Sequence, residues 1–135
     1  MQTFASMFRT LADPARLRIL ALLGRSGELC VCDIEEILGF TQTKTSRHLA
    51  YLRRTGLVRV RRRHLWKHYS LVPLEQEPTG RFLDLALALI EKDPAIVRDR
   101  NRLARRLRSA SCAACPPPAQ DHPRLENTTP KGVHA

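Results

Sequence analysis

Apolar side chains recur along most of the chain at intervals of three or four residues, which is the period of an amphipathic α-helix. Asp13 followed by Pro14, and Asp93 followed by Pro94, each place a capping carboxylate before a proline suited to the first helical position. Thr41 is a third expected N-cap, and glycines follow three of the apolar runs. The pattern therefore predicts helices around residues 7–11 and over residues 14–27, 31–40, 42–56, 81–93 and 94–110.

Residues 57–72 depart from this period, because apolar and polar residues alternate there in two runs, LVRVRR and WKHYSLV. Such alternation predicts a β-hairpin, here turning at residues 63–65. The hairpin directly follows two short helices whose connecting turn contains Gly39. That order is typical of a winged helix-turn-helix. The predicted fold class is therefore mainly α with a β-hairpin wing.

The helix predicted over residues 81–93 is apolar nearly all round, which is more apolar surface than a chain of 135 residues buries by itself. We therefore expect a symmetric homodimer, with Phe4, Met7 and Phe8 of the first helix sharing the interface. Residues 1–110 are predicted to form one DNA-binding and dimerisation domain. Residues 111–135 hold several prolines and few large apolar groups, and are expected to form a flexible tail.

The charge of the chain is strongly basic, with 23 Lys and Arg against 13 Asp and Glu and a net charge of +10. Nine of the basic residues, and no acidic residue, lie between Ile37 and Leu74, across the second short helix and the hairpin. This distribution of charge favours binding of these residues to double-stranded DNA over the alternative that they form a charged surface exposed only to solvent. On the helix, base edges are the expected targets of Gln42, Thr43, Ser46 and Arg47, and Lys44 is a further expected DNA contact. On the hairpin, phosphates are the expected targets of Arg61, Arg62 and Arg63, together with Lys67.

Other functional classes fit the sequence less well. Six arginines between residues 98 and 108 leave open a protein that grips RNA or DNA without specificity. The chain has no glycine-rich phosphate loop, no carboxylate pair in an expected cleft and no Ser/His/Asp set, so we do not expect an enzyme. It also has no apolar run long enough to span a membrane and no recognisable secretory signal, so we expect a cytoplasmic protein.

Four cysteines are the remaining chemical feature: Cys30, Cys32, Cys112 and Cys115. In a cytoplasmic chain they are expected to be reduced thiols. The first two lie at the entry to a helix, where the N-terminal dipole favours the thiolate, and thiolates bind soft ions. A bare C-x-C is also compatible with two small buried apolar residues. A C-x-x-C in the tail has a good ligand spacing but is equally compatible with no function.

The segments LADPARLRILALL and GELCVCDIEEILGFTQTKTSRHLAYLRRTGLVRVRRRHLWKHYSL resemble the ArsR/SmtB-type metal-responsive repressors over about residues 3–92, and ELCVCD resembles their arsenic branch. The resemblance implies a homodimeric repressor that leaves its operator when arsenite, antimonite or a trivalent organoarsenical binds Cys30 and Cys32. It implies no required cofactor. A thiol-redox-responsive repressor remains an alternative interpretation.

The chain departs from the arsenic pattern at Glu35, where relatives of this type often carry a third thiol. A tail thiol, Cys112 or Cys115, is a candidate for the missing ligand, from either subunit. Side chains two residues apart in a regular helix point about 200° apart. If Cys30 and Cys32 are both helical, one ion bridges them only when the first helical turn unwinds, and we expect that unwinding to reach the DNA-reading helix.

Overall fold

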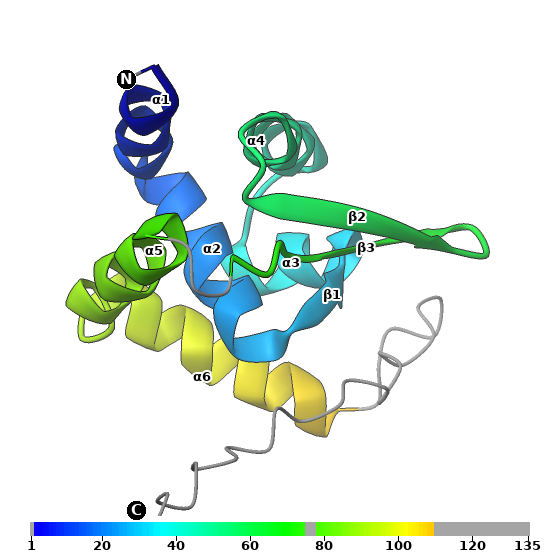
Figure 1. The fold of residues 1–135 in the computed structure, drawn as a ribbon. Coiled ribbons are helices and arrows are strands. Elements are labelled where there is room, and N and C mark those ends of the chain that lie inside the picture. The colour runs from blue at the N-terminus through cyan, green and yellow to red at the C-terminus, as the bar shows by residue number, and fades with distance from the viewer. Residues whose placement is uncertain (1, 75–77, 110–135) are drawn as a thin grey trace, which may run out of the picture.

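The computed structural model describes residues 2–74 and 78–109, excluding the side chains of residues 2 and 3. In chain order the elements are α1 (Gln2–Leu11), α2 (Pro14–Ser26), β1 (Glu28–Cys30), α3 (Val31–Leu38), α4 (Gln42–Arg54), β2 (Val58–Arg63), β3 (Trp66–Leu71), α5 (Pro78–Leu89) and α6 (Pro94–Arg108). Figure 1 shows the hairpin of β2 and β3 projecting from a body of helices. The tail predicted from residue 111 onward lies outside the described residues.

The helix starts predicted from local sequence are confirmed by their caps. The Asp13 carboxylate accepts hydrogen bonds from the backbone N–H of Ala15 (2.8 Å) and Arg16 (3.2 Å) at the start of α2. Asp93 and Thr41 cap α6 and α4 in the same way. These bonds satisfy N–H groups that the first helical turn leaves without a partner, so each cap fixes where its helix begins.

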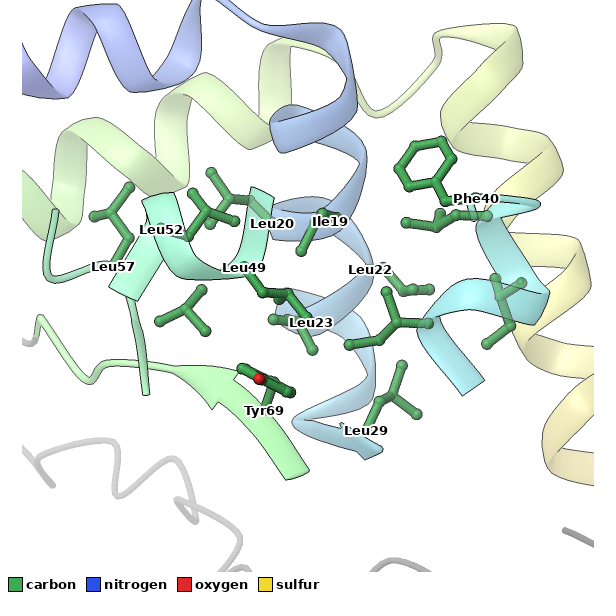
Figure 2. Packing of buried hydrophobic residues seen from close by; sticks show 14 of the residues in the cluster. Ile19, Leu20, Leu22, Leu23, Leu29, Phe40, Leu49, Leu52, Leu57 and Tyr69 are labelled. Atoms are coloured by element: carbon green, nitrogen blue, oxygen red, sulfur yellow. The ribbon is translucent and has the colours of Figure 1, made fainter. Parts of the chain in front are cut away.

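Helix α2 is the centre of the core. Ile19, Leu20 and Leu23 of this helix are fully or almost fully buried, and they face Leu49 and Leu52 of α4. Figure 2 shows these side chains interlocking between α2 and α4, with Tyr69 of β3 below them. Leu49 and Leu52 therefore form the inward face of α4, and the opposite face is turned away from the core.

The three strands form an antiparallel sheet in the order β1-β3-β2. Its first strand was missed by the sequence analysis, because three residues are too few to show a period of two. In the middle of the sheet Leu29 lies opposite Tyr69, which lies opposite Val60, and these side chains face the core. The next row joins Cys30 to His68 and belongs to the other face of the sheet.

An ion pair ties the C-terminal helix to the rest of the domain. Arg18 of α2 binds both carboxylate oxygens of Asp99 on α6 at 2.8 and 2.9 Å, and it also donates to the backbone carbonyl of Leu38 at 3.1 Å. Asp99 is almost completely buried. A single guanidinium therefore fixes α2, the end of α3 and the middle of α6 relative to one another.

The apolar surface expected for α5 is exposed in the single chain. Leu85 and Leu89 are 62% and 80% exposed, and Phe4 and Phe8 of α1 are 58% and 60% exposed. The Phe8 and Phe82 rings pack edge to face, with centroids 5.1 Å apart, so α1 and α5 form one continuous surface. None of the helices within residues 2–74 and 78–109 is long and apolar enough to cross a membrane.

Candidate functional site

The exposed face of α4 carries the side chains predicted to read DNA. Gln42, Thr43, Ser46 and Arg47 are exposed, whereas the intervening Thr45 is buried and positions the helix. All four lie in the first two turns, and the hydroxyl of Thr41 caps Lys44 N–H at 3.2 Å. The start of the helix therefore presents hydrogen-bonding groups in the arrangement that a recognition helix offers to the major groove.

Two side chains of α4, Lys44 and His48, are less exposed than the side chains predicted to read DNA. The Lys44 ammonium lies 4.2 Å from the centre of the Phe40 ring, and the Lys44 side chain is half-buried. His48 is buried. Burial lowers the pKa of His48, while the Asp13 carboxylate acts in the opposite direction. Burial therefore favours the neutral form of His48.

The wing carries the predicted cluster of cations. Arg61, Arg62 and Arg63 on β2 are exposed, and so is Lys67 on β3. Arg61 differs from the other two because its guanidinium binds Glu28 of β1 at 2.7 Å. This pairing, which the sequence analysis missed, leaves Arg62 and Arg63 as the wing arginines with the fewest competing contacts.

Cys30 and Cys32 come together where β1 meets α3. Cys30 is the N-cap residue of α3 and has extended backbone angles (φ −73°, ψ 157°), and Cys32 belongs to the first helical turn. Their Sγ atoms lie 2.7 Å apart. The condition under which these sulfurs would diverge is not met, because Cys30 is not helical. The pair therefore converges with α3 intact, and no unwinding is needed to bring the sulfurs together.

A carboxylate and a guanidinium adjoin the sulfurs. The Asp33 carboxylate and both sulfurs lie within 4.8 Å of one another, and these three residues are the only such group among the His, Cys, Asp and Glu side chains of the described residues. Arg106 of α6 binds Asp33 at 2.8 Å and Glu36 at 3.1 Å. The contact of Arg106 with Asp33 was not predicted, because these residues are 73 positions apart in the chain.

Two further predicted positions have different outcomes. His68 belongs to the wing strand β3, as expected, but it is buried, and its Nδ1 lies 3.7 Å from the Glu28 carboxylate. Cys112 and Cys115 lie outside the described residues.

Comparison with known proteins identifies similar sequences. The family described as "Bacterial regulatory protein, arsR family" matches residues 13–60, which run from the cap of α2 into β2. The arsenical resistance operon repressor of Escherichia coli (strain K12) is 44% identical over 97 residues, covering 71% of this chain and 83% of that protein.

Solved structures agree with the fold. The antimony-specific transcriptional repressor AntR is 36% identical, with a TM-score of 0.55, over 65% of this chain and 77% of AntR. A homodimeric winged helix-turn-helix DNA-binding domain from Mycobacterium bovis is 28% identical, with a TM-score of 0.57, over 69% of this chain and 82% of that domain. The predicted winged helix-turn-helix fold class is therefore confirmed.

Proposed function

We propose that this chain, which belongs to the arsR family of bacterial regulatory proteins, is a transcriptional repressor that leaves its operator when trivalent arsenic or antimony binds Cys30 and Cys32. Membership of the family supports the general conclusion that the chain regulates transcription through a DNA-binding domain. The finer part is carried by one observation: two sulfurs lie 2.7 Å apart at the start of the helix that packs against α4.

The chemistry of the proposed inducer suits this site. Each thiol that reacts with arsenous acid, As(OH)₃, forms one As–S bond and releases one hydroxyl as water. Cys30 and Cys32 thus supply two of three ligands as soft thiolates. Cys112 or Cys115 is proposed to supply the third. A methylated trivalent arsenical has one position blocked by carbon and needs only the first two.

Transmission to DNA is proposed to pass through α3 as a whole. Metalloid binding fixes Cys30, at the end of β1, to Cys32 in the first turn of α3. The far end of α3 leads through Gly39, in the left-handed conformation at φ 68°, directly to the N-cap of α4. Because this connection is short, a displacement of α3 on metalloid binding would change the orientation of the start of α4. Induction then selects between two arrangements of the domain, of which one binds the operator.

On the DNA side, the exposed residues of α4 are proposed to contact base edges, and the wing arginines to contact flanking phosphates of a double-stranded operator. Lys44 is assigned a phosphate-side role, because its ammonium already lies over Phe40 and its side chain is half-buried.

We expect a homodimer that buries the α1–α5 surface. The exposed phenylalanine and leucine side chains on that surface form an apolar patch. In a symmetric dimer the same patch of a second copy would pack against it and exclude water. The two recognition helices then enter successive major grooves roughly 34–36 Å apart. The expected result in analytical ultracentrifugation at micromolar concentration is a dimer, and a monomer would contradict the proposal.

The experiment that tests the proposed function is a titration of the DNA complex. A fluorescent duplex selected by the protein from a random-sequence pool is bound, and anisotropy is followed as arsenite, antimonite or methylarsenite is added. We expect near-stoichiometric release by these trivalent species. Release by hydrogen peroxide alone, with no response to arsenite, would favour the thiol-redox alternative. Equal affinity for the selected duplex and for a scrambled one would favour non-specific nucleic-acid binding.

A further inference from the structure

We propose that Arg16, at the start of α2, fixes the angle between α1 and the DNA-reading helix α4, and that this angle sets the separation of operator half-sites that the protein accepts. The inference rests on the proposed function and on its expected dimer, and it adds positioning residues behind the DNA-reading surface. It is carried by the contacts of a single guanidinium with two other helices.

The Arg16 guanidinium binds the C-terminal end of α1. Its Nε donates to the backbone carbonyl of Thr10 at 2.8 Å, and its Nη2 donates to that of Arg9 at 2.9 Å. Carbonyls in the last turn of a helix have no partner within the helix, and a cation there also meets the negative end of the helix dipole. Thr10 is completely buried. Arg16 therefore fixes the end of α1 against the start of α2.

The same guanidinium also packs on α4. Its Cζ lies 4.1 Å from the centre of the Tyr51 ring. The Arg16 side chain is 13% exposed and Tyr51 is half-buried, so this cation–π contact is partly shielded from water. Asp13, the N-cap of α2, lies 3.6 Å from Nη1 of Arg16 and balances its charge. One side chain of α2 thus contacts both α1 and α4.

Apolar packing alone defines the orientation of α4 less strictly. Leu49 and Leu52 pack against α2 through hydrophobic contacts, which depend on buried area and have little directionality. A guanidinium is planar and its donors form a rigid fork, so two carbonyl acceptors and one aromatic ring together specify a single arrangement. In Figure 1, α1 and α4 both stand at the top of the domain, with α2 below them. Arg16 therefore links the helix of the expected dimer surface to the helix that reads DNA.

In a symmetric dimer this link acts on the choice of operator. The packing of α1 places the twofold axis, and the angle between α1 and α4 places each recognition helix relative to that axis. Adding one base pair between two half-sites moves them apart by about 3.4 Å and rotates them by about 35°. A dimer in which this angle is fixed therefore accepts one separation, whereas a dimer in which α4 can tilt accepts several.

The test measures DNA affinity against half-site separation. The duplex selected by the protein is altered at its centre by adding or removing single base pairs, and each duplex is titrated by anisotropy at one salt concentration. Tyr51→Leu removes the ring, and Arg16→Lys removes the fork while keeping the charge. For each variant we expect the preference for the best separation over its neighbours to fall by roughly five- to tenfold.

Three further variants serve as controls. Tyr51→Phe keeps the ring and is expected to keep the wild-type preference. Arg54→Ala is the matched control, because the Arg54 Cζ also lies 5.5 Å from the centre of the Tyr51 ring, but both residues belong to α4 and their contact fixes nothing outside that helix. The combined variant, Arg16→Lys with Tyr51→Leu, is expected to lose no more preference than either single variant, because both act through one contact.

An unchanged preference in Arg16→Lys and Tyr51→Leu would overturn the inference. The same holds if affinity falls equally at every separation, since that result means a purely structural role. Additive losses in the combined variant, or an equal loss for Arg54→Ala, would also contradict it. If Tyr51→Leu does not fold, Arg16→Lys decides the question. All of these results leave the proposed function intact, whereas wild-type protein that binds every duplex equally, a scrambled one included, would contradict the proposed function itself.

Discussion

Replacing Cys30 or Cys32 with serine is expected to abolish release from DNA by arsenite while leaving DNA affinity without inducer unchanged. A serine hydroxyl is not a soft ligand and stays protonated at neutral pH, so each substitution removes one As–S bond. Cys30 is buried, so the unfolding temperature of the Cys30→Ser variant has to accompany the test. The Cys30 side chain makes no capping hydrogen bond to α3, and serine is a preferred N-cap, typically stabilising a helix by about 1 kcal/mol relative to a residue that cannot cap.

The measurement is the anisotropy titration with the single and double variants, together with thermal unfolding of each. A double variant that releases DNA at the wild-type arsenite concentration would overturn the assignment of both thiols. A variant that fails to bind DNA before arsenite is added, although it unfolds at the wild-type temperature, would show that Cys30 or Cys32 has a separate role in the DNA-binding conformation.

Replacing the cations of α4 and the wing is expected to separate sequence reading from general DNA affinity. Arg47→Ala should reduce the preference for the selected duplex over a scrambled one by about 1–3 kcal/mol, because a base-edge contact is lost. Arg62→Ala with Arg63→Ala should weaken binding to both duplexes. The slope of log affinity against log salt should flatten by roughly 0.9 for each lost phosphate contact.

Arg61→Ala is expected to have a smaller effect than either neighbour, because Glu28 already neutralises this guanidinium at 2.7 Å. Arg98→Ala, at an exposed position on α6, is the control and should change neither quantity. A change in salt slope for Arg98→Ala as large as for the wing variants would favour non-specific binding by the arginines of α6. Loss of preference from the wing variants alone would mean that α4 is not the recognition helix.

The helices and the wing were predictable from the sequence because their determinants are local. The caps at Asp13, Thr41 and Asp93 bond to N–H groups two or three residues away. The buried face of α4 follows from the period of its own leucines, and the hairpin from alternation within two short runs. For the same reason the exposed polar face of α4 could be predicted, because Gln42, Thr43, Ser46 and Arg47 lie opposite the buried leucines of the same helix.

The geometry of the thiol site was decided only by tertiary structure. Cys30 lies directly before a helical run, and its extended backbone follows from pairing of β1 with β3, whose residue His68 lies opposite it. That pairing turns the Cys30 sulfur toward Cys32, where a continuous helix would have separated them. The contact of Asp33 with Arg106 likewise spans 73 residues, and that of Arg18 with Asp99 spans 81. No local pattern encodes such pairs, because each forms only when α6 packs across α2 and α3.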